Sequence, residues 1–332
     1  MRLARLAFHG EERSGVVAGD GVHLLPPGIS VDDLVLAGLA RALEVGAQAL
    51  RDEPVDLDDV VLLAPLRPRS IRDFVAFEEH VRGVRRSIDG VGGVPDAWYD
   101  APTFYFTNAS SVIGTGDDVA VPGGSKALDF ELEVATVVGS RGRDLTPQSA
   151  RDVVFGFTIL NDWSARDLQG REMQVNLGPC KGKDFASTLG PWIVTADEME
   201  QWRDDEGFLD VWCTAEVNGS VVGRDLLSNI GWSPETMIAY ASRDADVHPG
   251  DVLGSGTVGN GGCLAELWGI NGSRETPPPL QVGDVVTLTV EGIGSITNRV
   301  VEGRAPQPLP APRRRDTAAI RAAHPRRPGG EP

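Results

Sequence analysis

The sequence predicts a β-dominated α+β protein in which a small N-terminal unit precedes a larger domain. From residue 69 to about residue 302, short β-rich runs alternate with Gly and Pro turns, and long helical patterns are few. Residues 1–66 carry their own strand and helix patterns and lead into a linker marked by Pro65 and Pro68. A length of 332 residues is sufficient for two units with their own cores.

The N-terminal unit, residues 1–66, is expected to be β-rich with one helix. Residues 3–8 and 15–17 are apolar, strand-like runs joined by a turn that contains glycine. Residues 34–50 then show a helical pattern of apolar positions.

The larger domain, residues 67–303, is expected to contain few helices. The segments 147–152 and 234–242 are the clearest helical patterns, because each begins with a proline, which suits the first turn of a helix. Thr146 stands where it would cap the first of them.

The last segment, residues 304–332, differs from the rest in composition and charge. It holds seven arginines against Asp316 and Glu331, and it has almost no large apolar residues, so we expect a disordered Pro/Arg-rich tail. The whole chain has a net charge of −17; removing the tail's +5 leaves about −22 on the body. Such a body repels nucleic-acid phosphates and anionic lipid, so we expect neither as a partner.

No apolar run approaches the roughly 18–20 residues of a membrane span, and the first ten residues lack the apolar stretch of a signal peptide. The cysteines Cys180, Cys213 and Cys263 are odd in number and far apart. Their spacing predicts neither a disulfide framework nor a zinc site. We therefore expect a cytoplasmic protein.

Acidic residues alternate with apolar ones in residues 128–138, the run LDFELEVATVV. If this run is a strand, its period of two places Asp129, Glu131 and Glu133 on one face. Adjacent carboxylates that lead into an apolar strand repel one another and resist burial. A cation held by oxygen ligands, Mg²⁺, Mn²⁺ or Ca²⁺, would resolve that conflict. The alternative is a strand with a solvated acidic face.

A second strand-like run, residues 153–160, ends in NDWSARDLQ. Asp162 lies at the end of this strand, where it can supply a further carboxylate, although a strand-end Asp taken alone is more often structural. Ser164 with Asp167 forms a possible helix cap.

A histidine follows an acid by seven residues at Asp73 and His80. In a helix this spacing is two turns, which would place both side chains on one side. A structural histidine is the alternative.

These motifs, taken in order, resemble the fumarylacetoacetate hydrolase family over roughly residues 65–302. The matching runs are LDFELE, LNDWSARDLQ and LGPCKGKDF. The resemblance implies a mixed β-roll fold, a small N-terminal domain and a homodimer. It also implies metal ligands at Glu131, Glu133 and Asp162, with Asp73 matching a further carboxylate ligand of the true fumarylacetoacetate hydrolases.

The resemblance assigns catalytic roles as well. His80 matches a histidine that activates water and is oriented by a distant glutamate, here Glu266, and Lys183 matches a residue that stabilises an oxyanion. Glu266 follows a Gly-rich loop, residues 254–262, that either approaches a substrate carboxylate or is a plain flexible turn. Substrate-side positions of the family correspond to Tyr105, Arg166, Gln169 and Thr257, although Arg166 has the alternative of pairing with nearby carboxylates.

Three positions depart from the family's patterns. Gly83 stands where the short, acylpyruvase-like members carry the Glu of a His-x-x-Glu pair, so the His80–Glu266 pair is the better match. Val75 and Met173 replace tyrosines that contact substrate in the namesake enzymes. The chemistry is therefore expected to be kept while the substrate differs.

The resulting hypothesis is a hydrolase that cleaves a C–C bond of a small β-diketo acid or 1,3-diketone with a divalent metal, Mg²⁺ first. Rival reactions on the same scaffold are oxo-acid decarboxylation, tautomerisation and dienoate hydration. A non-catalytic protein that binds a metal and an oxo-acid is the rival from another class.

Overall fold

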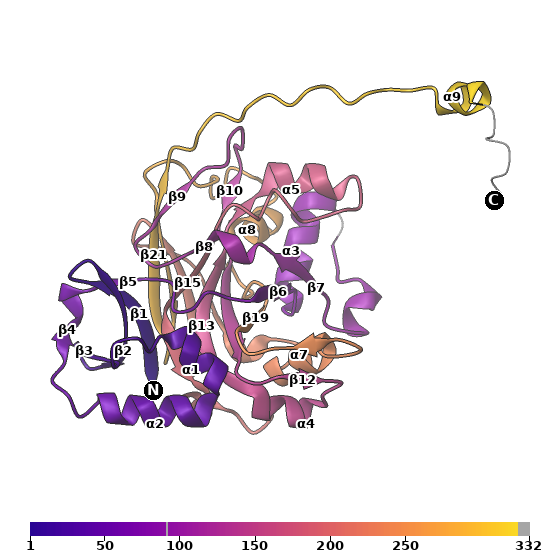
Figure 1. The fold of residues 1–332 in the computed structure, drawn as a ribbon. Helices are drawn as coiled ribbons and strands as arrows, with labels where there is room; N and C mark the ends of the chain where they lie inside the picture. The colour runs from indigo at the N-terminus through magenta and orange to yellow at the C-terminus, as the bar shows by residue number, and fades with distance from the viewer. Residues whose placement is uncertain (91, 325–332) are drawn as a thin grey trace.

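The computed structural model describes residues 1–90 and 92–324, apart from the side chains of residues 88 and 89. Most of its strands belong to two sheets (Figure 1). The larger sheet contains, in spatial order, β4 (Val55–Asp56), β3 (Gly21–Leu24), β2 (Glu11–Ala18), β1 (Arg2–Phe8), β15 (Ser187–Thr195), β13 (Val154–Asp162), β11 (Leu132–Val138), β19 (Asp251–Gly254), β6 (Ser70–Phe74) and β7 (Phe104–Thr107), with β5 (Val61–Leu62) beside β1 and β8 (Val112–Ile113) beside β15.

The smaller sheet contains β17 (Ser220–Leu226), β16 (Trp212–Val217), β20 (Val285–Val290), β21 (Gly294–Val301) and β9 (Asp118–Ala120). Two further pairs are short: β10 (Leu128–Asp129) with β14 (Ser164–Ala165), and β12 (Gly142–Arg143) with β18 (Asp246–Val247). The helices are α1 (Val31–Ala37), α2 (Leu39–Ala49), α3 (Glu78–Asp89), α4 (Pro147–Ala150), α5 (Arg166–Met173), α6 (Ala196–Met199), α7 (Pro234–Ala241), α8 (Leu264–Asn271) and α9 (Thr317–Ala323). The predicted β-dominated α+β class is confirmed.

Two cores lie on opposite faces of the larger sheet. On one face, Val134 and Ile159 pack with Ala215 and Leu288 of the smaller sheet, so the principal core is sandwiched between the two sheets. On the other face, side chains of α1 and α2 pack against residues such as Val137. Strand residues buried on both faces read as continuous apolar runs.

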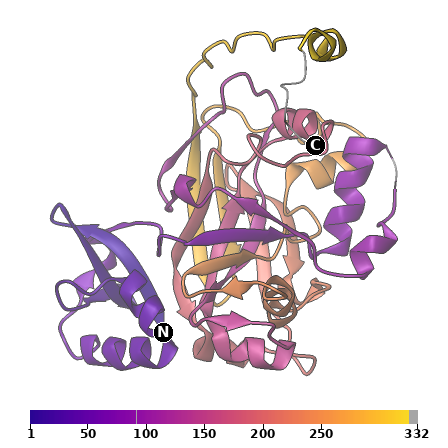
Figure 2. The ribbon, with the colours of Figure 1, turned by 45° about the vertical axis from the view of Figure 1, so that its right-hand side comes forward.

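The predicted N-terminal unit, residues 1–66, forms a lobe at one side of the molecule (Figure 2). Its first strand nevertheless pairs with β15, with Arg2 opposite Val194 and Leu3 opposite Ile193. The unit therefore extends the main sheet and shares the core beneath α1 and α2. A domain boundary at residue 66 stays a prediction.

The helix predicted over residues 34–50 is two helices, α1 and α2, and the single-helix prediction was wrong. Gly38 separates them with a φ of 88°, a left-handed value that favours glycine and that no helix interior contains. The other two helical predictions are confirmed: α4 begins at Pro147 with Thr146 as its N-cap, and α7 begins at Pro234.

Within the described part of the chain, no helix is both long and apolar enough to cross a membrane. Residues after 304 lead away from the body, and α9 lies at a distance from it (Figure 1). Nearly every described side chain of this tail is exposed, although Arg304 and Pro306 approach Gly123. The short helix α9 was not predicted from the composition.

Removal of residues 307–332 is expected to leave folding stability within about 0.5 kcal/mol of the full chain, the usual range for exposed positions. Turnover should likewise stay unchanged, because the described part of this segment buries almost no apolar surface. Thermal melts and steady-state rates of the truncated and full chains check this. A large fall in either would show that the tail docks on the body or on a second copy.

Candidate metal centre and active site

The acidic run at 128–138 is not one continuous strand, so the prediction that Asp129 shares a face with Glu131 and Glu133 was wrong. β10 ends at Asp129 and β11 begins at Leu132. Between them, the Glu131 N–H donates at 2.9 Å to the side-chain Oδ1 of Asn161 in β13 and not to a backbone carbonyl of that strand. The break turns Asp129 towards the start of α8.

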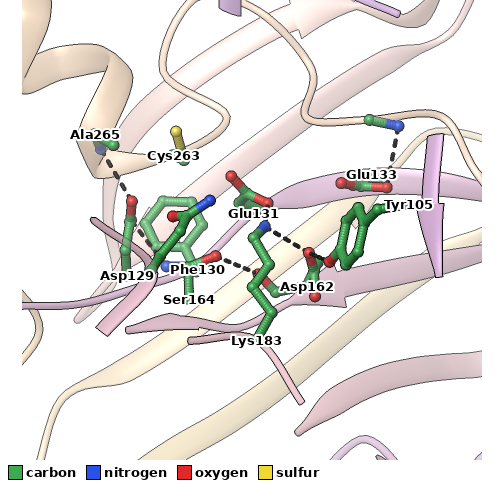
Figure 3. Close-up of polar contacts among 12 residues, drawn as sticks. Tyr105, Asp129, Phe130, Glu131, Glu133, Asp162, Ser164, Lys183, Cys263 and Ala265 are labelled. Carbon is green, nitrogen blue, oxygen red and sulfur yellow. Dashed lines mark hydrogen bonds and ion pairs between the residues drawn. The ribbon is translucent and has the colours of Figure 1, made fainter. Parts of the chain in front are cut away.

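The Asp129 carboxylate accepts hydrogen bonds from the N-terminus of α8 and from a buried arginine. It accepts from the N–H groups of Leu264 at 2.8 Å and Ala265 at 3.0 Å (Figure 3). These are among the helix donors that have no partner within the helix. Arg166 Nε donates to the same carboxylate at 2.8 Å. Asp129 therefore fixes α8, the helix that carries Glu266.

Four other carboxylates converge instead: those of Asp73, Glu131, Glu133 and Asp162. One oxygen of each lies within 4.8 Å of an oxygen of every other, and all four side chains are buried. Asp73 belongs to β6, Glu133 belongs to β11 and Asp162 ends β13, while Glu131 lies in the break before β11. Figure 3 shows Glu131 and Asp162 beside Lys183, with Glu133 farther away near Tyr105.

Gly254 leaves the space in which Asp73 and Glu133 meet. It ends β19, the strand between β11 and β6, and lies opposite Asp73 in the parallel pairing. A Cβ at this position would lie 2.5 Å from Glu133 Oε2 and 2.9 Å from Asp73 Oδ1, closer than real Cβ contacts. A side chain there would fill the centre of the cluster.

Two buried cations offset part of the negative charge. Lys183 Nζ donates to Glu131 and, at 2.5 Å, to Asp162 Oδ2. Arg166 donates to Glu131 Oε1 at 2.7 Å while it also pairs with Asp129. Asp129 and the four clustered acids make five carboxylates against two cations, so the cluster retains an excess of negative charge.

The pKa shifts follow from that excess. Burial, then repulsion by Asp162, raises the pKa of Asp73 well above its ordinary value. Burial and the neighbouring Asp73 do the same to the pKa of Glu133. Burial would also raise the pKa of Glu131, but Arg166 and Lys183 outweigh it and hold that pKa below its usual range. Without a further cation, Asp73 and Glu133 therefore tend to hold protons.

The residues fit a divalent cation. Asp73 Oδ1, Glu133 Oε1 and Asp162 Oδ1 are buried and, among the described residues, have no hydrogen-bond partner. Buried polar atoms almost always have a hydrogen-bond partner, so three unpartnered oxygens in one cluster indicate a site for a cation. An oxygen-only donor set suits Mg²⁺, Mn²⁺ or Ca²⁺.

His80 and Glu266 also meet, though not as the spacing from Asp73 predicted. Asp73 belongs to strand β6, and His80 lies in the first turn of α3, so the two are not two turns apart on one helix. His80 Nδ1 is 3.8 Å from Glu266 Oε2. Cys263 Sγ is 3.7 Å from the same nitrogen, a contact that sequence analysis missed because no spacing rule links the residues.

Tyr105 and Arg166, two of the four residues matched to substrate-side positions, contact the clustered carboxylates directly. The Tyr105 hydroxyl donates to Asp162 Oδ2 at 2.5 Å, and Gln169 Oε1 accepts from Arg166 at 3.1 Å. Thr257 is buried in the Gly-rich loop. Arg166 pairs with Asp129 and Glu131, which fits its structural alternative; its substrate role stays a prediction.

The predicted cap formed by Ser164 and Asp167 was wrong. α5 begins after Ala165, which makes no side-chain cap. Ser164 Oγ donates to the Asp162 carbonyl, and Asp167 accepts from Ser125 Oγ at 2.7 Å. Ser164 therefore stabilises the turn after Asp162, whereas Asp167 ties α5 to the segment before β10.

The Gly-rich loop, residues 254–262, is almost entirely buried and is not a plain flexible turn. The Gly256 N–H donates to Glu133 Oε2 at 3.1 Å. Gly256 has a φ of 77°, and a Cβ there would lie 2.5 Å from the Phe74 carbonyl oxygen. The loop thus holds Glu133 in place and leads directly to Cys263 and Glu266.

Comparison with known proteins agrees with this geometry. The profile of the fumarylacetoacetate (FAA) hydrolase C-terminal family matches residues 69–301. Fumarylacetoacetase of Arabidopsis thaliana is 30% identical over 331 residues, covering 79% of this chain and 78% of that protein. The mitochondrial oxaloacetate tautomerase FAHD2A of Homo sapiens is 35% identical over 202 residues, covering 60% of this chain and 59% of that protein.

A solved structure shows the same fold. The fumarylacetoacetate hydrolase of psychrophilic Exiguobacterium antarcticum superposes with a TM-score of 0.72 at 27% identity, covering 92% of this chain and 100% of that one. Fold and site thus define a class of sheet-based proteins with a buried cluster of carboxylates that is suited to bind a cation. The chain belongs to the fumarylacetoacetate hydrolase family.

Proposed function

We propose that the chain is a divalent-metal-dependent hydrolase that cleaves a C–C bond of a small β-diketo acid or 1,3-diketone. The observation that supports this best is the pairing of two groups. Three of the four buried carboxylates have an oxygen without a hydrogen-bond partner among the described residues, and a buried histidine whose Nδ1 faces Glu266 supplies a candidate base. Metal binding alone needs no such histidine.

Asp73, Glu131, Glu133 and Asp162 would hold the cation. When bound, a divalent cation supplies Lewis acidity towards the oxygens of a 1,3-dicarbonyl substrate. The Tyr105 hydroxyl and the Gly256 N–H orient two of these carboxylates, to Asp162 and Glu133 respectively.

His80 is the proposed general base. Its Nδ1 faces Cys263 and Glu266, which leaves Nε2 as the ring nitrogen that takes a proton from water. Arg166 bridges Glu131 and Asp129, and Asp129 accepts from the first N–H groups of α8, so the helix that carries Glu266 is tied to the carboxylate cluster. Glu266 would stabilise the imidazolium that forms and hold the ring in this orientation.

Lys183 is suited to act as a fixed positive charge and not as a base. Burial would lower its pKa, but Asp162 and Glu131 outweigh burial and raise it above the ordinary value. The ammonium therefore stays charged and can stabilise an oxyanion on the attacked carbonyl. Collapse of the oxyanion breaks the C–C bond, and the departing carbon receives a proton. One water and one diketo acid therefore give a carboxylic acid and a ketone or keto acid.

Tautomerisation is the second candidate, because human oxaloacetate tautomerase FAHD2A is a 35% identical relative. Reaction in H₂¹⁸O with Mg²⁺ or Mn²⁺ separates the two. A hydrolase acting on an acylpyruvate or a diketone splits the carbon chain and places ¹⁸O in the new carboxylate. Complete recovery of unsplit acylpyruvates and diketones, with rapid interconversion of oxaloacetate tautomers, would contradict the proposal. Release of CO₂ would indicate a decarboxylase.

The distal end of the substrate is proposed to be apolar. Val75 follows β6 and Met173 ends α5 with 49% of its surface exposed, so neither offers the phenolic hydroxyl expected from the namesake enzymes. Arg82 is already paired with Glu78 at 2.5 Å, and Arg85 donates to the Gly93 carbonyl. Two candidate clamps for a distal carboxylate are therefore engaged elsewhere.

A β-diketo monoacid with an alkyl tail is accordingly expected to give a higher kcat/KM than a matched diacid. An apolar wall discriminates by only about 1–3 kcal/mol per methylene, so the preference should be moderate. Steady-state kinetics with the two substrates measures it, and Arg86→Ala is the control for the remaining arginine. A preference of tenfold or more for the diacid, about 1.4 kcal/mol, would overturn this assignment.

A further inference from the structure

A second group of potential metal ligands lies beside the proposed base, apart from the four carboxylates. His80, Cys263 and Glu266 each place a ligand atom within 4.8 Å of the other two. Their exposed fractions are 7%, 0% and 1%. His80 belongs to the first turn of α3, Cys263 is the N-cap of α8, and Glu266 lies in the first turn of that helix.

The distances are close to those of a tetrahedral site. His80 Nδ1 lies 3.7 Å from Cys263 Sγ and 3.8 Å from Glu266 Oε2. Zinc bonds of about 2.0–2.3 Å at tetrahedral angles place such ligand atoms about 3.4–3.6 Å apart. Side-chain shifts of a few tenths of an ångström would therefore close the site, with water in the fourth position.

An unpartnered carboxylate oxygen faces this group. Glu266 Oε2 is buried and has no hydrogen-bond partner within residues 1–90 and 92–324. Among the described residues, Cys263 Sγ accepts a single 3.4 Å contact, from the Glu266 N–H, besides its contact with His80. Two of the three ligand atoms thus have spare capacity in a site from which water is largely excluded.

The donor set differs in kind from that of the carboxylate cluster. Thiolate and imidazole favour zinc and other soft or borderline ions, whereas oxygen donors alone favour Mg²⁺, Mn²⁺ or Ca²⁺. Solvent approaches from the outer side of α3 and α8, where Glu266 lines a cleft of about 220 Å³ together with Glu79, Gly83 and Asn260. We expect zinc to enter from this side, because Glu266 is the one of the three ligands that lines this cleft.

We propose that His80, Cys263 and Glu266 form an inhibitory zinc site. Binding forms Zn–S, Zn–N and Zn–O bonds and releases the thiol proton to solvent. The bound ion then occupies the nitrogen through which Glu266 orients His80 and engages Glu266 itself. The inhibition rests on the proposed function of His80, but the binding of zinc does not.

Cobalt tests the binding directly, because thiolate–Co²⁺ bonds give a near-ultraviolet charge-transfer band and tetrahedral Co²⁺ absorbs strongly in the visible. One equivalent of Co²⁺ is added to the full chain in excess Mg²⁺, which occupies the carboxylate cluster. The wild type and Cys180→Ser, which alters the exposed cysteine, should give both signals. Cys263→Ser should lose the near-ultraviolet band.

Glu266→Gln provides a second variant that keeps the thiol. It should retain the charge-transfer band while its zinc affinity falls at least tenfold, as measured by competition with a chelating dye. Absence of the band in the wild type, or its loss in Cys180→Ser but not in Cys263→Ser, would overturn the site. These readouts hold whether or not the proposed hydrolase activity is found.

Inhibition is tested by zinc titration at saturating Mg²⁺, with each variant compared with its own zinc-free rate. Zinc should inhibit the wild type and Cys180→Ser equally, and the half-inhibitory concentration should rise at least tenfold in Cys263→Ser. Added Mg²⁺ should not relieve the inhibition. Relief in proportion to Mg²⁺ would show that zinc acts at the carboxylate cluster, and the proposed inhibitory role would be wrong.

Discussion

Replacement of His80 by alanine is expected to lower turnover by about 10²–10⁴-fold, the usual contribution of a positioned general base. The Nε2 atom is lost, while the four clustered carboxylates are left unchanged. Bound metal, measured by elemental analysis, should therefore stay at the wild-type level. Wild-type turnover in His80→Ala would exclude the proposed base.

Glu266→Gln is expected to cause a smaller loss in turnover than His80→Ala. The amide keeps the shape of the side chain but removes the charge 3.8 Å from His80 Nδ1. A residue that acts through the imidazole should shift the pH profile of kcat, whereas a merely structural role should not. Glu79→Gln is the matched control, because Glu79 is the acid next to His80 in the same turn of α3 and points towards the outer cleft. Its rate and pH profile should stay close to wild type.

Sequence analysis predicted the four clustered carboxylates, but alternation along one strand accounts for only part of the cluster. Glu131 and Glu133 lie two positions apart, so the alternation predicted them together even though Glu131 lies in the break before β11. Asp73 reaches the cluster through the pairing of β6 with β19, in which it lies opposite Gly254. That contact joins residues 181 positions apart, and only the family resemblance indicated it.

Asp129 shows why a strand pattern alone misleads. Its place in the alternation was the same as that of Glu131, yet the start of α8 requires an acceptor for the Leu264 and Ala265 N–H groups. The helix that needs this acceptor lies more than a hundred residues later in the chain. The strand is interrupted where Asp129 turns towards that helix. The Cys263 contact with His80 was hidden for the same reason, since it depends on the packing of α3 against α8.

Chelation of the metal is expected to abolish activity and to lower the melting temperature. A cation at 100 times its dissociation constant stabilises the folded state by about 2.7 kcal/mol if the unfolded chain does not bind it. The loss should be restored by added Mg²⁺ or Mn²⁺. Full activity in chelator-treated protein that contains no metal by elemental analysis would refute the metal assignment.

The effect of the metal on stability should grow with pH. In the metal-free folded protein, burial raises the pKa values of Asp73 and Glu133, so the folded state holds protons that the unfolded chain releases above its ordinary carboxyl pKa of roughly 4. The stability contributed by these two groups is fully present below that pKa and is lost as pH rises through the raised values. Bound cation removes this loss because it keeps both carboxylates ionised at little penalty.

Melting curves at pH 5.5 and pH 8, with and without Mg²⁺, measure this difference, and Glu133→Gln sharpens it. The amide oxygen can still accept from the Gly256 N–H but carries no charge, so the metal-free variant should melt higher than metal-free wild type at pH 8. Its gain from Mg²⁺ should be smaller, because one ligand charge is missing. A metal-free wild type that becomes more stable from pH 5.5 to pH 8, with no gain from Glu133→Gln, would mean that like-charge repulsion does not control this cluster.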